Sequence, residues 1–257
     1  MIDSSTSPEF VAPDSIDLLT LDLAVIGRQL AAGSELDPVA ARTAVLAGVL
    51  HALPAISRTS LTNRAAPDRR PTTLAASDDT ALSLDTVQYG LGDGPCLTAV
   101  AQLISIRSLD LAAEERWPSF ARAALTRTPV RSVISCSLAD GGHAGTSLNL
   151  YVDRPITETD PDHGRIAAVA AACALALTAI EQRHRADHLD KALSNSRQIG
   201  MAMGILMSSQ HLSADQAFDA LRVSSQHSHR KLRDVAEDVL LTGALPEGRL
   251  PWHSAGS

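Results

Sequence analysis

An apolar repeat with helical spacing occupies residues 166–180 and continues into a strongly charged segment. Its members recur every three or four residues, at Ile166, Val169, Cys173, Leu177 and Ile180. The same register extends through EQRHRADHLDKAL towards Ile199. This spacing predicts one long helix that leaves a first domain and enters a second. The charged middle of this helix has few apolar residues. We therefore expect a connecting coiled coil that needs a partner helix to be stable. The alternative is a buried terminal helix followed by a solvated linker.

The region before this repeat mixes helical and strand-like patterns. Asp17–Ala32 and Pro38–Leu53 carry apolar residues at helical spacing and predict two helices. Between them and the repeat, Gly, Pro and Asp separate short runs that are typical of strands. These runs are residues 57–62, 104–107, 130–138 and 146–153, with a turn predicted at Gly141-Gly142. The order favours an α+β domain built on a mostly antiparallel sheet.

The last sixty or so residues predict a small helical bundle. Ser213 and Gln216 have the spacing of a capping box, which begins one helix. A second helix is expected to begin near Ser228 and to end at Gly243. Its apolar residues recur at helical positions, as Leu232, Val235, Ala236, Val239 and Leu240. A bundle of this size is marginally stable alone and gains from dimerisation.

Charge and aromatic content restrict the partners. The net charge is -7 and only 3% of residues are aromatic. The charge counts against a non-specific DNA coat, and the low aromatic content argues against a broad platform of stacked bases. Any contact with nucleic acid must therefore come from a local basic surface.

Cysteine usage and the termini favour a cytoplasmic protein. Three sparse cysteines, Cys96, Cys136 and Cys173, form no C-x-x-C pair and suit a reducing compartment. The N-terminus lacks the features of a secretory signal. The apolar run of residues 166–180 is shorter than the roughly 20 residues of a spanning helix. The histidines His51, His143 and His163 lack metal-ligand spacing, so no metal, haem or other cofactor is expected.

Two sets of ordered motifs lie in the two predicted domains. The C-terminal set comprises Ser196–Met207 (SRQIGMAMGILM), Ala217-Phe218, Leu221-Arg222, Ser225 and Arg230–Ala236. Over about residues 186–243 it resembles the ANTAR domain of RNA-binding antiterminators, usually found at the C-terminus of bacterial regulators. The upstream set comprises Gln88-Tyr89, Gly92–Leu97, Asp110, Arg116–Pro118, Arg131-Ser132 and Leu148–Tyr151. It is similar, more diffusely, to the GAF sensor domain of actinobacterial GAF–ANTAR proteins.

The resemblance implies a domain organisation and a mechanism. The expected parts are a disordered tail (1–15), a GAF-like sensor domain with N-terminal helices (16–183), an ANTAR-like RNA-binding domain (184–245) and a second tail (246–257). A small-molecule or protein signal at the GAF domain is expected to control pairing of ANTAR domains in a homodimer. The dimer is expected to bind RNA with two stem-loops that carry hexanucleotide loops. That RNA fold competes with a terminator hairpin, so transcription reads through.

Two glycines are candidate RNA-binding positions. Gly200 and Gly204 lie four residues apart inside a helical pattern, at a cost of about 1 kcal/mol each relative to alanine. A helix face without side chains lets RNA backbone or a partner helix approach closely. The alternative is tight packing within the bundle, to which the neighbouring Ile199, Met203, Leu206 and Met207 are assigned.

The basic candidates for RNA contact are Arg197, Arg222, Arg230, Lys231 and Arg233. Guanidinium and ammonium groups suit phosphate, and arginine also stacks on splayed bases. The alternative for each is a solvated side chain or a helical ion pair, Arg230 with Asp234 and Arg233 with Glu237. Two positions depart from the family, which often has lysine at Met203 and asparagine at His229.

The sensor domain offers weaker candidates for ligand sensing, Gly92, Gly94 and Cys96. With Pro95, the two glycines form a loop that leads into a helix, where free backbone N–H groups would bind an anion. Cys96, just inside the helix, would have a lowered thiol pKa. The alternative is a small buried residue.

Two other functions stay open at this stage. One is a GAF-type thiol enzyme that reduces methionine sulfoxide, although Cys173 falls on the core-facing stripe of its helix. The other is a DNA-binding helix-turn-helix whose recognition helix starts SHRKLRD.

Overall fold

The computed structural model describes residues 37–64, 66, 68–139, 143–160 and 163–246. Contacts within the chain divide it into two compact units, Met1–Gln182 and Arg183–Ser257. The predicted helix Asp17–Ala32, the turn at Gly141-Gly142 and the N-terminal tail lie outside the described residues, as does the C-terminal tail after Pro246.

The first unit is built on one five-stranded antiparallel sheet, as predicted. Its strands are β1 (Arg58–Asn63), β2 (Thr72–Ala76), β3 (Ser105–Ser108), β4 (Ser132–Ser137) and β5 (Thr146–Val152). They lie in the order β2-β1-β5-β4-β3, with every neighbouring pair antiparallel. Every residue of the central strand β5 is buried, because both of its faces are covered.

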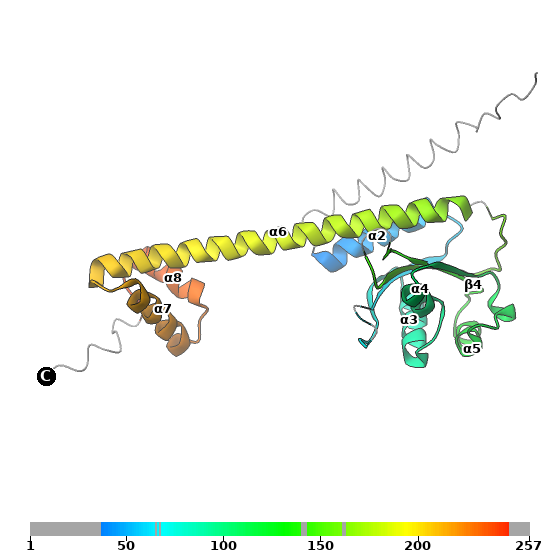
Figure 1. Cartoon of the computed structure of the whole chain (residues 1–257), viewed down its shortest axis with the longest axis horizontal. Coiled ribbons are helices and arrows are strands. Elements are labelled where there is room, and N and C mark those ends of the chain that lie inside the picture. Colours follow the sequence, from blue (N-terminus) through cyan, green and yellow to red (C-terminus); the bar gives the residue numbers. More distant parts are fainter. Residues whose placement is uncertain (1–36, 65, 67, 140–142, 161–162, 247–257) are drawn as a thin grey trace, which may run out of the picture. The chain divides into compact units, whose positions relative to one another are not determined.

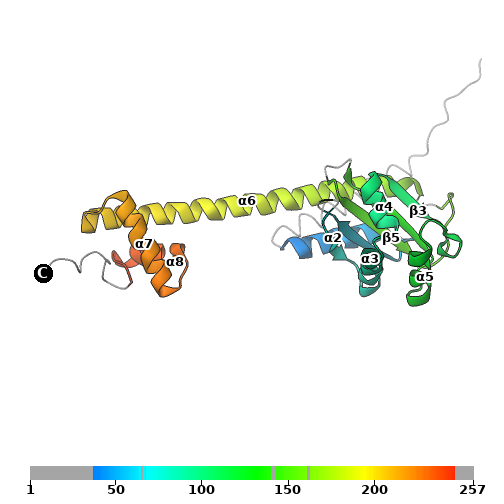
Figure 2. The ribbon, with the colours of Figure 1, turned by 60° about the horizontal axis from the view of Figure 1, so that its bottom comes forward.

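Helices cover both faces of the sheet (Figures 1 and 2). On one face lie α2 (Pro38–Ala52) and the beginning of α6 (His163–Gln210). On the other lie α3 (Asp79–Leu91), α4 (Pro95–Gln102) and α5 (Pro118–Arg127), with the short 3₁₀ helix η2 (Leu111–Ala113) before α5. The first unit is therefore a three-layered α+β domain.

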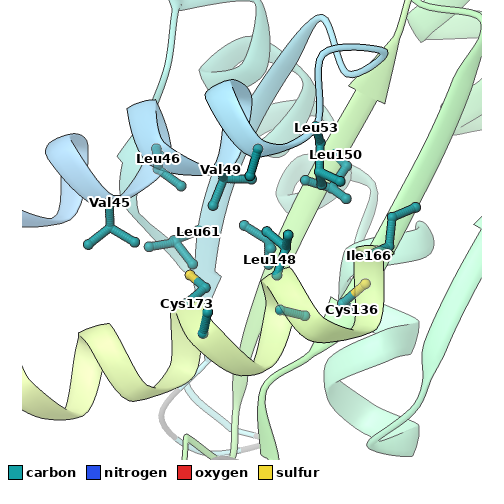
Figure 3. Packing of buried hydrophobic residues seen from close by; sticks show 14 of the residues in the cluster. Val45, Leu46, Val49, Leu53, Leu61, Cys136, Leu148, Leu150, Ile166 and Cys173 are labelled. Carbon is teal, nitrogen blue, oxygen red and sulfur yellow. The ribbon is translucent and has the colours of Figure 1, made fainter. Parts of the chain in front are cut away.

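The core under α2 and α6 explains the alanine-rich repeat. Leu61, Leu148 and Leu150 project from β1 and β5 and are fully buried against the two helices (Figure 3). The predicted stripe of α6 is buried there, from Ile166 to Leu177. Alanines between those residues let the helix approach the sheet closely. By length and composition α6 also meets the criteria for a membrane span, and 44% of that apolar window is buried inside the structure.

The predicted long helix is confirmed, since α6 continues without a break for 48 residues into the second unit. In that unit it packs with α7 (Ala214–Ser228) and α8 (Leu232–Thr242). The core of this bundle is formed by Ala202, Leu206, Ala217, Ala220, Leu221, Val235, Ala236 and Val239.

The ends of α7 and α8 follow the sequence signals at all but one point. The capping box is present, with the Gln216 amide N–H donating to Ser213 Oγ at 3.2 Å. Gly243 ends α8 in the left-handed region, with φ +77°. The start expected near Ser228 is instead the end of α7, because His229 adopts φ +52° and closes that helix. Helix α8 begins three residues later than His229.

Candidate functional site

The glycine face of α6 is exposed. A Cβ atom added at Gly200 or Gly204 would meet nothing within 4 Å. Ala202 and Leu206, on the opposite side of the helix, are fully buried in the bundle core. Packing within the described part of the chain therefore does not require either glycine, which removes support from the tight-packing alternative. Arg197 and Met201 share the exposed face with them.

Three of the five basic candidates take part in surface ion pairs. Arg222 Nη2 lies 3.0 Å from Asp219 Oδ1, and Arg233 Nε lies 3.0 Å from Asp234 Oδ1. Arg230 pairs with Asp238. The pairings differ from those anticipated, Arg230 with Asp234 and Arg233 with Glu237, because the turn before α8 places Arg230 beside a residue eight positions on. About half of each arginine side chain stays exposed.

Arg197 and Lys231 are exposed and form no ion pair within the part of the chain that the structure describes. Exposed ion pairs stabilise a protein little, so a phosphate can displace the carboxylates that pair with the other three arginines. The five basic residues are thus all accessible, although they are not all equally available.

A pair of hydrogen bonds fixes the turn that presents Arg230 and Lys231. The Arg230 amide N–H donates to the Ser225 carbonyl at 3.1 Å, and Ser225 Oγ donates to the Arg230 carbonyl at 2.6 Å. Ser225 belongs to the motif set, but sequence reasoning gave it no role. The sequence offered one signal for this role, which is a polar side chain five residues before Arg230. His229 occupies a left-handed position, which favours glycine or asparagine and thus explains the family's asparagine by backbone conformation.

A second cluster of polar groups lies inside the first unit, between the sheet and α3. The Asp85 carboxylate is buried and accepts hydrogen bonds from Tyr151 Oη (2.6 Å), Ser60 Oγ (2.9 Å) and Thr73 Oγ1 (2.9 Å). Burial raises the pKa of Asp85 from 3.8 to about 6, and the hydrogen bonds oppose this shift.

The cluster extends beyond Asp85. Tyr89 Oη lies 2.9 Å from Thr62 Oγ1, and Asn149 Nδ2 donates to the same oxygen at 2.9 Å. Tyr89, Asn149 and Tyr151 were markers of the GAF resemblance, but sequence reasoning missed Asp85 and did not bring the four together. Asp85 lies on a helix distant in sequence from β5, and only the fold makes them neighbours.

The predicted sensing residues come together, but not as an open anion site. Gly92 ends α3 at φ +67° and Gly94 precedes α4 at φ +143°. The Gln88 side chain packs against Gly94 so closely that a Cβ there would lie 2.5 Å from Gln88 Oε1. The same oxygen accepts the Cys96 amide N–H at 2.8 Å. A side chain of the protein therefore already occupies this donor at the start of α4.

Of the two interpretations of Cys96, the structure bears out the small buried residue and contradicts a lowered thiol pKa. Cys96 is fully buried, and burial raises its pKa well above the ordinary value. Cys136 and Cys173 lie in the core on the other side of the sheet (Figure 3). Burial also raises the pKa of both, that of Cys173 to about 12. All three cysteines are therefore small buried residues, which is the second interpretation given for Cys96.

The ANTAR domain family matches residues 187–240. The resemblance of the C-terminal motifs is thus confirmed, and the chain carries an ANTAR domain, a module of RNA-binding antitermination regulators. This match covers the end of α6, all of α7 and most of α8. No curated protein matches the chain.

Structures similar to this chain include GAF domains. That of an Acinetobacter phosphoenolpyruvate-protein phosphotransferase is 12% identical, with a TM-score of 0.47, and covers 69% of this chain and 99% of its own. That of the Coxiella burnetii phosphotransferase is 15% identical, with a TM-score of 0.44, and covers 68% and 98%. The type II free methionine-R-sulfoxide reductase of Thermoplasma acidophilum is 14% identical, with a TM-score of 0.38, and covers 53% and 92%.

Buried Asp85 predicts an unusual dependence of stability on pH. Because the folded state raises this pKa from 3.8 to about 6, the folded protein holds the proton more tightly than the unfolded chain. The contribution of Asp85 to the free energy of unfolding is therefore greatest below pH 4 and falls by on the order of 3 kcal/mol as pH rises through 6. Urea denaturation from pH 4 to 7 should reveal this fall in the wild type but not in Asp85→Asn. The exposed Asp79→Asn is the control on the same helix, and parallel profiles for wild type and Asp85→Asn would contradict the expectation.

Proposed function

We propose that this protein is a signal-responsive RNA-binding transcription antiterminator. Its ANTAR domain would bind leader-transcript RNA with paired hexaloop stem-loops and so prevent the terminator hairpin from forming. The observation that carries this proposal is the ANTAR match over residues 187–240, in which the glycine face of α6 and the basic turn before α8 are both exposed.

The proposed RNA contacts combine close approach with positive charge. Gly200 and Gly204 leave the main chain of α6 accessible to the RNA backbone, with Arg197 one turn away. Arg222, Arg230, Lys231 and Arg233 supply phosphate contacts and stacking partners for bases splayed out of the loops. A local basic surface of this kind would allow RNA binding despite the net charge of -7.

We further propose that two chains pair through α6. Every residue from Glu181 to Ser194 is exposed, including Leu189 (59%) and Leu193 (56%). A helix without packing partners is marginal in water, so this stretch gains stability from a second helix. Within the second unit the spacing of uncharged residues alternates between three and four, as in a coiled-coil seam. The seam residues are Ala186, Leu189, Leu193 and Ser196, and the seam ends before the glycine face begins at Gly200.

Charges beside the seam favour a parallel pair. Arg185 precedes the seam residue Ala186, and Asp190 follows Leu189, which places them at g and e positions five residues apart. In a parallel coiled coil, a g residue faces the e residue of the next heptad on the partner. Arg185 of each chain would therefore face Asp190 of the other chain, and two-fold symmetry gives two such ion pairs. An antiparallel pair centred near Leu189 would instead bring Asp190 towards its own copy.

The first unit is proposed as the sensor, with α6 transmitting a shift between paired and unpaired ANTAR domains. The buried Gln88 Nε2 and Ser135 Oγ have no hydrogen-bond partner within the described residues. Such orphan groups cost free energy, which a polar ligand that reached them would recover. An intracellular RNA target and three free cysteines suit a cytoplasmic location.

The two competing functions receive less support. A thiol reductase needs an accessible cysteine with a lowered pKa, whereas all three thiols are buried with raised pKa values. A DNA recognition helix needs a basic exposed face. Helix α8 carries Asp234, Glu237 and Asp238 against the single Arg233, so duplex phosphates would repel it.

Binding to RNA tests the proposal directly. The full chain should bind a paired-hexaloop RNA more tightly than the same RNA with scrambled loops. Arg197→Ala and Lys231→Ala should each weaken binding and lower the salt dependence of log K by about one. Lys191→Ala is the matched control, since it removes an exposed charge from α6 away from the glycine face. Equal affinity for both RNAs would overturn the proposal.

Gly204→Ala separates RNA contact from folding. The added methyl group meets no atom within 4 Å, so the variant should be more stable than the wild type by about 1 kcal/mol because alanine favours helix. RNA affinity should nevertheless fall, because the methyl group would hold the RNA backbone away. Denaturation and RNA titration on the same samples measure both effects. Unchanged RNA affinity would remove Gly204 from the interface.

Charge exchange tests the parallel pairing. Arg185→Glu alone and Asp190→Arg alone should each weaken dimerisation, because like charges would then face each other across the seam. The double variant should restore it. Sedimentation equilibrium at low salt measures the effect, and dimerisation that is insensitive to both single changes would exclude this register.

A further inference from the structure

Two histidines face each other on the exposed part of α6. His184 and His188 lie one helical turn apart, and their Nε2 atoms are 3.1 Å apart. The ring centroids are separated by 4.3 Å. Both side chains are exposed and belong to the second unit. One N–H donating to the other ring nitrogen accounts for this geometry in the free protein.

The same separation matches two ligands of one metal ion. Imidazole nitrogens bind zinc at about 2.0–2.1 Å. Two such bonds at an angle between a right angle and a tetrahedral one place the nitrogens roughly 2.9–3.4 Å apart. An ion could thus replace the shared proton with little movement of either ring. Histidines at i and i+4 on one helix face are the arrangement that zinc-binding helices use.

We propose that His184 and His188 form a binding site for one divalent transition-metal ion. Neutral imidazole selects Zn²⁺, Ni²⁺ or Cu²⁺ over Mg²⁺ and Ca²⁺, which prefer oxygen. No group of three or more ligand side chains occurs in the described residues, so water completes the coordination. The surrounding charge does not repel a cation, because Asp187 and Asp190 balance Arg185 and Lys191.

Bound metal would stabilise a stretch of α6 that is little supported within a single chain. Residues 181–194 are all exposed, so this stretch receives no packing from the part of the chain that the structure describes. A metal that links residues four apart binds only when that turn is helical, and it therefore shifts the local equilibrium towards helix. The histidines occupy outer positions of the coiled-coil register, away from the seam, so the site would stay accessible in a paired α6.

The effect of this helix stabilisation on function rests on the proposed role of α6 as the connection between sensor and RNA-binding domain. Metal binding itself does not rest on that role. Failure of the metal site would leave RNA binding untouched. Loss of RNA binding would likewise leave the metal site intact. The two ideas can therefore be tested separately on the same protein.

The test uses the full chain without an affinity tag. Isothermal titration with Zn²⁺ and with Ni²⁺ should give one ion per chain, and the signal should be lost in His184→Ala and in His188→Ala. Both changes place alanine at exposed helical positions, so folding is not at risk. His227→Ala, an exposed histidine of α7, is the control and should bind like the wild type.

Hydrogen exchange provides a second measurement. Zn²⁺ should slow exchange of the amides around residues 184–192 in the wild type and leave the His184→Ala, His188→Ala double variant unchanged. Binding that survives in the double variant, or that His227→Ala abolishes equally, would overturn the proposal. Binding without any change in exchange would overturn its effect on the helix.

Discussion

The burial of one stripe of α6 against the antiparallel sheet underlies the organisation of this protein. Ile166, Val169, Cys173 and Leu177 complete a core that β1, β5 and α2 leave open on one face. Because the helix continues past that core, the element that closes the core of the first unit also contributes Ala202 and Leu206 to the core of the ANTAR bundle. A change in the packing of α6 therefore acts on a helix that belongs to the cores of both units.

The exposed middle of α6, residues 181–194, lies between the parts of the helix that pack in the two units. Between its two packed ends the helix has no support within the described chain, and this is where Leu189 and Leu193 are exposed and where His184 and His188 meet. A marginal helix is sensitive to small stabilising contributions, which suits the role proposed for α6 in passing a signal. The face of α6 that carries Gly200 and Gly204 comes next along the helix. Helix pairing and RNA contact would therefore use adjacent surfaces.

Sequence patterns predicted much of the fold, and the errors have identifiable causes. Strand β2 (TTLAA) was missed because it is short, lies at the sheet edge and lacks the bulky alternation of a strand. The start of α8 was placed too early because no standard signal marks His229, a histidine in a left-handed position. The partners of Arg230 and Arg233 were misassigned because helical spacing was applied to residues at a turn. For Cys96 the sequence leaves a helix-start thiol and a small buried residue both open, and burial, which governs its pKa, decides for the buried residue.

The sequence by itself determined the long helix, the antiparallel α+β domain and the ANTAR motifs, because periodicity, caps and ordered motifs are local properties of the chain. Only the tertiary structure decided that Gly200 and Gly204 are exposed, that Gln88 blocks the start of α4, and that Asp85 meets Tyr151 and Asn149. Exposure and the pKa of a buried group depend on which distant segments pack together. Spacing along the chain carries no record of that packing.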